Sequence, residues 1–238
     1  MSNTAIIRGI GWVLKESMGF PGHIRPAGQG LSLPELSGKQ VLGQPYKAFG
    51  RMDYFSKLGF SAIAFAMSHA GILPLPVKDK NPVQKKEIPL IAESATGCIE
   101  TDLLYQSAMS RKPVMPSPAL FAYTLPSCFL GEAAIYFGLT GEAYMMEPPD
   151  SNGLTALSTA MDNLAIYPRV VCGVCNSDGY AFPGALFLVL DRLDADTGKH
   201  RSHPFPLTIT RHSTAGPFHC NGTPVTALQG LAFDPATS

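Results

Sequence analysis

The chain has 238 residues with 18 basic and 18 acidic side chains, so its formal net charge is zero, and no cluster of five or six basic residues occurs. This balance lacks the basic footprint of nucleic-acid-binding proteins, so we expect no nucleic-acid partner. Charged residues make up 15% of the chain and hydrophobic residues 45%, a low charge density that an obligate partner would explain, although a compact α/β domain with a large apolar core is the simpler explanation.

Strand and helix patterns alternate along the chain. Residues 5–12 predict a strand, residues 13–49 are rich in Gly and Pro and predict a long loop, and a helix begins at Asp53 or Ser56. The further predicted elements are strands at 88–92, 143–146, 169–174, 185–191 and 207–210, and helices at 97–111, 128–137 and 150–163. Near-continuous apolar strands indicate a sheet covered on both faces, so we expect a layered α/β domain with a mostly parallel sheet.

The sequence gives no sign of a membrane span, an export signal or a cofactor. No run of about eighteen apolar residues occurs, and a strand pattern follows directly after the first four residues. Five cysteines in mostly apolar context fit a reducing compartment, so we expect a cytoplasmic protein. Cys172 and Cys175 have the spacing of a zinc or redox pair but lie inside a predicted buried strand, and His212 and His219 lack a strong ligand geometry. We therefore expect no metal or other cofactor.

One strand-to-helix connection carries a candidate functional residue. The short apolar strand at 143–146 ends at Pro148-Pro149, and Asp150-Ser151-Asn152 offers side-chain acceptors for the first N–H groups of the next helix. Such an elbow exposes one side chain above the sheet, and the positive helix end lowers the pKa of a thiol placed there. This is a typical position for a reactive cysteine, yet it holds Asp150. Its plain structural role would be an N-cap, which contributes on the order of 1 kcal/mol.

A series of short motifs, each weak alone, runs along nearly the whole chain. They are Ile7-x-Gly9-Ile10-Gly11, Gly50-Arg51-Met52-Asp53, Gly97-x-x-Glu100-Thr101, Ser117-Pro118, Leu125-Pro126, Gly131-Glu132, Gly138-Leu139-Thr140-Gly141, Asn152-Gly153-Leu154 and Pro183-Gly184-Ala185. In this order and spacing they resemble the β-ketoacyl synthase family, which has the thiolase fold, and most closely its short chain-length factors of aryl-polyene-type gene clusters. Counting from Gly141 to Gly153, the family's nucleophilic cysteine falls on Asp150.

The resemblance implies that residues 1–238 form one thiolase-like α/β domain that corresponds to the N-terminal half of a ketosynthase. We expect a layered, mostly parallel five-stranded sheet with helices on both faces. The family places two catalytic histidines in the second half of a longer chain, and none of the six histidines here stands in a matching motif. Without a thiolate and a base, nucleophilic acyl transfer has no starting geometry, so we expect no catalytic residue and no activity of the chain alone.

The resemblance also gives roles to apolar residues outside the elbow. In the family, the position of Leu120 reaches across a dimer interface into the partner's acyl pocket, and Phe121 and Tyr123 would shape the same wall, which limits how many chain units fit. Ordinary core packing is the alternative for Leu120.

In the thiolase fold, the strand at 143–146 pairs antiparallel with its counterpart in a second subunit, and an unpaired apolar edge favours such pairing. We therefore expect Leu125, Met145 and Met146 at a subunit interface.

The resulting hypothesis is a noncatalytic chain-length factor. It would form a heterodimer with a full-length β-ketoacyl-ACP synthase, shape that enzyme's acyl pocket, and contact acyl carrier protein through the complex, in aryl polyene or related type II fatty acid or polyketide elongation. Two alternatives stay open. One is a stand-alone enzyme that uses Asp150 as a general acid or base on an acyl thioester, and the other is a homodimeric structural or acyl-binding protein.

Overall fold

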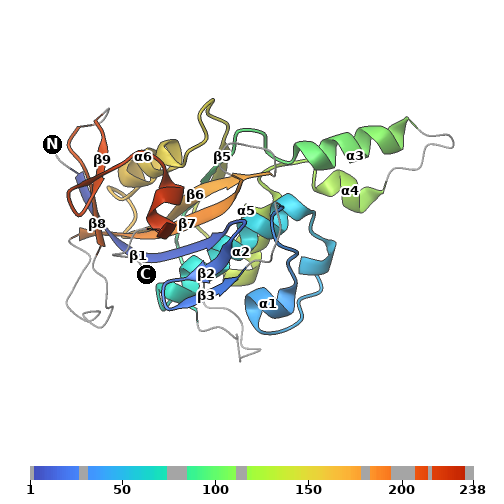
Figure 1. Cartoon of the computed structure of the whole chain (residues 1–238), viewed down its shortest axis with the longest axis horizontal. Coiled ribbons are helices and arrows are strands. Elements are labelled where there is room, and N and C mark those ends of the chain that lie inside the picture. The colour runs from blue at the N-terminus through green and yellow to red at the C-terminus, as the bar shows by residue number, and fades with distance from the viewer. Residues whose placement is uncertain are drawn as a thin grey trace.

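A mixed β-sheet with helices on both faces forms the centre of the computed structural model, which describes residues 3–26, 32–73, 85–110, 117–177, 183–193, 207–213 and 216–233 (Figure 1). The strands are β1 (Asn3–Val13), β2 (Ser17–Phe20), β3 (His23–Pro26), β4 (Leu90–Glu93), β5 (Ala143–Met146), β6 (Arg169–Asn176), β7 (Gly184–Arg192), β8 (Leu207–Arg211), β9 (Phe218–Cys220) and β10 (Thr223–Val225). The helices are α1 (Gly38–Leu42), α2 (Tyr54–His69), α3 (Ile99–Met109), α4 (Pro118–Ala122), α5 (Cys128–Phe137) and α6 (Leu154–Asn163), with 3₁₀ turns η1 (Phe49–Arg51) and η3 (Leu228–Phe233).

The strand order is β10-β9-β8-β1-β7-β6-β4-β5, with β2 and β3 beside β1. Two strand pairs are parallel, β4 with β5 and β4 with β6, and the other pairs between the described strands are antiparallel. The α/β class and the helices on both faces are therefore confirmed, whereas the mostly parallel five-stranded sheet is wrong. The apolar runs of β6 and β7 reflect burial on both faces, which here accompanies antiparallel pairing.

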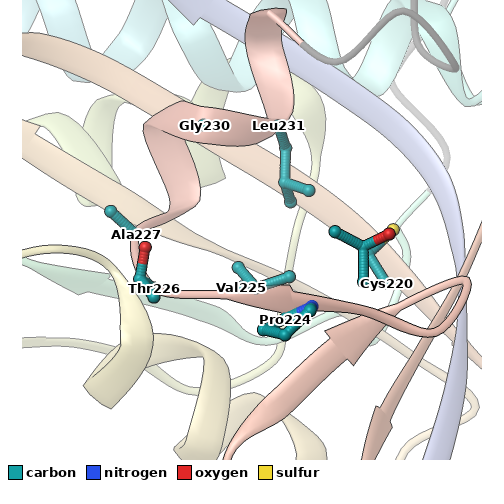
Figure 2. A pocket seen from close by; sticks show the side chains of 8 residues that line it. Cys220, Pro224, Val225, Thr226, Ala227, Gly230 and Leu231 are labelled. Carbon is teal, nitrogen blue, oxygen red and sulfur yellow. The ribbon is translucent and has the colours of Figure 1, made fainter.

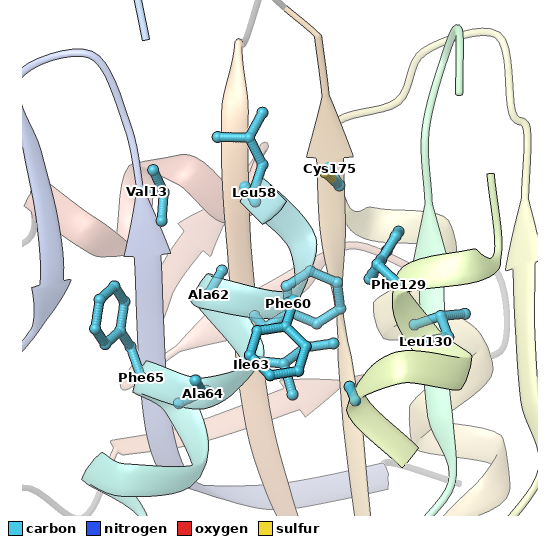
Figure 3. Packing of buried hydrophobic residues seen from close by; sticks show 14 of the residues in the cluster. Val13, Leu58, Phe60, Ala62, Ile63, Ala64, Phe65, Phe129, Leu130 and Cys175 are labelled. Atoms are coloured by element: carbon cyan, nitrogen blue, oxygen red, sulfur yellow. The ribbon is translucent and has the colours of Figure 1, made fainter. Parts of the chain in front are cut away.

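One face of the sheet is covered by α2 and α5, and aromatic side chains fill the contact (Figure 3). Asp53 Oδ1 caps α2 by accepting a hydrogen bond from the Ser56 N–H at 2.9 Å. The helix lies unusually close to β1 because Gly9 and Gly11 have no side chain. A Cβ atom at either glycine would stand 2.2 Å from a backbone atom of Ala66.

The opposite face is covered by α6 and by the C-terminal elements. Helix α6 buries Ala156, Leu157, Ala160 and Met161 against this face. Beside it, η3 packs on β1, β7 and β10. The outer side of α6 carries polar residues instead: Thr155, Ser158, Thr159 and Asp162. This chain therefore covers the second face of its own sheet, and α6 presents a polar surface outward.

No helix among the described residues is long and apolar enough to cross a membrane.

Candidate functional site at the elbow before α6

The elbow lies at the C-terminal end of β5, where parallel strands in α/β proteins commonly place functional residues. Asp150 is exposed there, as expected for a side chain mounted above a sheet. Its expected role as N-cap is wrong, because α6 begins only at Leu154. Gly153, with φ of 90°, is the residue before the first turn, and its own side chain offers no acceptor. Asp150 therefore stands three residues upstream of the position that an N-cap occupies.

Glu93, at the end of β4, caps α6 in its place. Its carboxylate is fully buried and accepts hydrogen bonds from the N–H groups of Gly153 at 2.5 Å and Ala156 at 2.7 Å. Burial raises the pKa of Glu93 above its usual range, although the backbone N–H groups of Ala156, Gly153 and Thr155 favour its charged form. The carboxylate of the elbow that touches the helix is thus Glu93 and not Asp150.

Asn176, the last residue of β6, fixes the elbow from the other side. Its Nδ2 donates to the Ser151 carbonyl at 3.0 Å, and its Oδ1 accepts from the Ala95 N–H at 3.0 Å. The sequence analysis missed both Glu93 and Asn176. A signal was present, because Glu93 directly follows the predicted strand at 88–92 and Asn176 lies two residues after the predicted strand at 169–174.

Four cysteines have pKa values raised above the usual thiol range. Burial raises the pKa of Cys98 to about 12 and also raises the pKa of Cys128, Cys172 and Cys175. A thiol acts as a nucleophile only as a thiolate, so none of these four is activated. The pair Cys172 and Cys175 lies in the core, as expected.

Helices α3 and α4 project from the sheet as an arm (Figure 1). In the described part of α3 only Thr101 is buried, and its hydroxyl donates to Asp53 Oδ2 at 2.6 Å, which anchors the base of the arm. The arm exposes large apolar side chains: Ile99, Leu103, Leu104, Met109, Phe121 and Leu125. An 11-residue helix with so little tertiary contact is only marginally stable in water, so this surface is suited to a partner.

The residues expected to form an acyl-pocket wall separate into two groups. Leu120 is half-buried in α4, and Phe121 is 61% exposed and packs on Tyr105 with ring centroids 5.5 Å apart. Tyr123 is buried and turns toward α5, where its hydroxyl donates to Glu132 at 3.0 Å. The structure therefore places Leu120 and Phe121 on the arm, and Tyr123 at the junction between arm and body.

The residues expected at an interface lie on the arm and on β5. Leu125 is 63% exposed. Met145 and Met146 are half-buried and contact the cores on opposite faces of the sheet. Strand β5 itself has one strand neighbour within the described residues, β4, so its other edge is open.

A pocket of about 150 Å³ lies between the β9–β10 hairpin and η3 (Figure 2), and Asp150 is not among the residues that line it. It is smaller than the roughly 300–1,000 Å³ of typical ligand sites. Nearby, the rings of His212 and His219 lie 5.2 Å apart. No group of three His, Cys, Asp or Glu side chains in the described ranges could hold a metal ion.

The sequence matches no protein-family model and no curated protein. Its fold, in contrast, matches several solved structures. The ishigamide ketosynthase/chain-length factor aligns with a TM-score of 0.59 and 14% identity over 82% of this chain and 60% of that one. A β-ketoacyl synthase from Burkholderia phymatum STM815 aligns with a TM-score of 0.60 and 14% identity over 88% of this chain and 63% of that one.

A third match is the complex of the ketosynthase ApeO with its chain-length factor ApeC from Xenorhabdus doucetiae. It has a TM-score of 0.56 and 14% identity over 79% of both chains. This chain spans only 60% of the ishigamide protein and 63% of the Burkholderia protein. The expected thiolase-like fold is confirmed: the chain has the fold of the β-ketoacyl synthases, which it shares with the proteins of ketosynthase and chain-length-factor complexes.

Proposed function

We propose that this protein is a noncatalytic chain-length factor that pairs with a full-length β-ketoacyl-ACP synthase in the cytoplasm. Residues 1–238 act as one domain equivalent to the N-terminal half of a ketosynthase. The complex elongates chains bound to acyl carrier protein, in aryl polyene or related fatty acid or polyketide synthesis. The observation that carries this proposal is the ketosynthase fold together with an exposed carboxylate, Asp150, at the elbow to which the sequence resemblance assigns the family's cysteine.

The surfaces of the fold favour one mode of pairing. The polar outer side of α6 argues against a second ketosynthase half packed on that helix. The open edge of β5 and the apolar arm form the remaining candidate surface, and they are continuous. At the base of the arm, a Cβ atom at Gly97 would lie 2.9 Å from Pro126 and 3.6 Å from Glu147, which directly follows β5. A ketosynthase that adds its own edge strand to β5 would therefore also cover the arm.

Leu120 is the residue proposed to limit product length, because it lies on the arm and would reach the partner's acyl pocket. Leu120→Trp adds bulk at this wall, so the co-purified complex is expected to release chains shortened by one or two elongation units. Product lengths measured by mass spectrometry check this. Ala119→Trp, a neighbouring exposed position in α4, serves as the control. Unchanged product lengths in Leu120→Trp would refute the wall role but leave the subunit assignment intact.

Co-expression with candidate ketosynthases tests the function as a whole. We expect the chain to co-purify with its ketosynthase in equal amounts and to be poorly soluble alone. The chain alone should not turn over malonyl or acyl carrier protein. Turnover that Asp150→Ala abolishes would support the stand-alone enzyme instead, and a stable homodimer that binds no ketosynthase would support a structural or acyl-binding protein.

A further inference from the structure

The hydrogen bonds of the first turn of α6 are all made within the chain. A helix leaves its first N–H groups without intrahelical acceptors, and buried N–H groups must find acceptors elsewhere. In α6, the N–H groups of Gly153 and Ala156 each donate to one oxygen of Glu93. The N–H of Thr155 also favours the charged form of this carboxylate. One internal side chain thus accepts from two donors of the turn and interacts with a third.

The remaining donor of the turn is satisfied by the elbow itself. The N–H of Leu154 donates to Asn152 Oδ1 at 3.1 Å. The next N–H, from Leu157, already makes the first intrahelical bond, to the Gly153 carbonyl at 3.0 Å. Three of the four N–H groups before Leu157 therefore have acceptors within the chain, and the fourth, from Thr155, interacts with the Glu93 carboxylate rather than with Asp150.

These hydrogen bonds limit how far the first turn of α6 can stabilise an anion at position 150. A thiolate before a helix is stabilised by unpaired N–H groups and by the positive helix end. The same kind of donor stabilises the oxyanion of an acyl-transfer intermediate. We infer that Glu93 fills the N-terminus of α6 from inside the protein, so that no nucleophile at position 150 can be activated while Glu93 is in place. This goes beyond the proposed function, because it holds with or without a partner.

Restoring the family's cysteine tests the inference. In Asp150→Cys we expect the new thiol to keep a pKa near the ordinary value of about 8.5. The pKa is measured from the pH dependence of iodoacetamide alkylation, followed for each peptide by mass spectrometry so that native cysteines do not interfere. Glu147→Cys provides an exposed reference thiol in the same segment but outside any helix start. The two thiols should have the same pKa within about half a unit.

Removing the Glu93 carboxylate from the N-terminus of α6 should lower the pKa of the thiol at position 150. Glu93→Gln retains the shape, offers one acceptor oxygen instead of two and removes the negative charge that interacts with position 150, so the first turn becomes available to a thiolate there. In Asp150→Cys/Glu93→Gln the thiol pKa should fall by at least about one unit, and alkylation at pH 7 should rise roughly tenfold. The Glu147→Cys/Glu93→Gln pair should show no such change.

A thiol pKa below about 7.5 in Asp150→Cys alone would overturn the inference. This variant changes one exposed residue and leaves the core intact, so we expect it to fold. An unchanged pKa in a folded double variant would overturn it as well. Both measurements are made on the co-purified complex, or on the chain alone if it does not pair and stays in solution, since alkylation is read at the peptide that contains residue 150. A failure to pair with a ketosynthase would refute the proposed function without affecting this result.

Discussion

Replacing Leu104 or Leu125 by glutamate is expected to weaken pairing with the ketosynthase by about 100-fold, which corresponds to about 2.8 kcal/mol. Both side chains lie on the arm and are more than half exposed, at 61% and 63%. If the partner covers them, each substitution buries an unpaired carboxylate in an apolar contact, where a few central residues carry most of the binding energy. The chain itself should stay folded, because neither side chain is in the core, glutamate is a good helix former at position 104 in α3, and Leu125 lies in the turn between α4 and α5.

The matched control is Ile166→Glu. Ile166 is 75% exposed, so the chemical change is similar. It precedes β6, whereas the arm begins beyond the C-terminal end of the parallel strand β4, so the two sites lie at opposite ends of the strands. We expect Ile166→Glu to co-purify with the ketosynthase like the unmodified chain. The measurement is the dissociation constant of the purified pair by calorimetry or surface plasmon resonance. Equal affinities for all three variants would show that the arm is not the interface.

The elements that follow the arm in the chain show which features local sequence patterns can predict. The structure confirms the strand at 143–146 and the helix at 128–137 with the predicted bounds, because strong local signals delimit them. Gly138 ends α5 in the left-handed conformation, with φ of 68°, and Pro148-Pro149 follows β5. Local patterns do not predict that α3 and α4 project from the sheet. That arrangement depends on how few of their residues make tertiary contacts.

The missed β2–β3 hairpin has a related cause. Its strands have four residues each, and every residue of β3 is exposed, so no alternation of buried and exposed residues marks it in the sequence. The predicted loop at 13–49 is therefore wrong for these residues. The C-terminal hairpin, β9 and β10, is equally short, with three residues per strand. Short strands are held by their neighbours in the sheet more than by their own pattern.

At the elbow, some features follow from nearby residues in the sequence, whereas others depend on contacts between distant residues. Its place in the chain and the exposure of Asp150 follow from the prolines and the nearby strand. The true capping residue could not be found in this way, because Glu93 and Gly153 are 60 residues apart and meet only through the pairing of β4 with β5 and β6. A carboxylate at the end of a buried strand was the available signal, and its acceptor role becomes visible only once α6 lies above that strand.

Asp191 provides the prediction with the largest effect on stability. Its carboxylate lies between two guanidinium groups: it accepts from Arg8 Nε at 2.9 Å, and from Arg169 Nε at 2.5 Å and Nη2 at 2.7 Å. The side chains of Arg8 and Asp191 are only 9% and 8% exposed. Arg8, Arg169 and Asp191 belong to the adjacent strands β1, β6 and β7, so the ion cluster links three neighbouring strands of the sheet.

Asp191→Asn should lower the free energy of unfolding by about 3–5 kcal/mol, because it removes one partner and leaves two cations together in a buried place. Asp162→Asn is the control, since Asp162 also pairs with a buried arginine, Arg211, but is 61% exposed. Arg211 also keeps its bond to Ser158 Oγ at 2.6 Å, so we expect a loss below about 1 kcal/mol. Urea unfolding followed by circular dichroism measures both. A loss under about 1 kcal/mol in Asp191→Asn would mean that water reaches the cluster and that β1, β6 and β7 are held together without it, by their backbone hydrogen bonds and apolar packing.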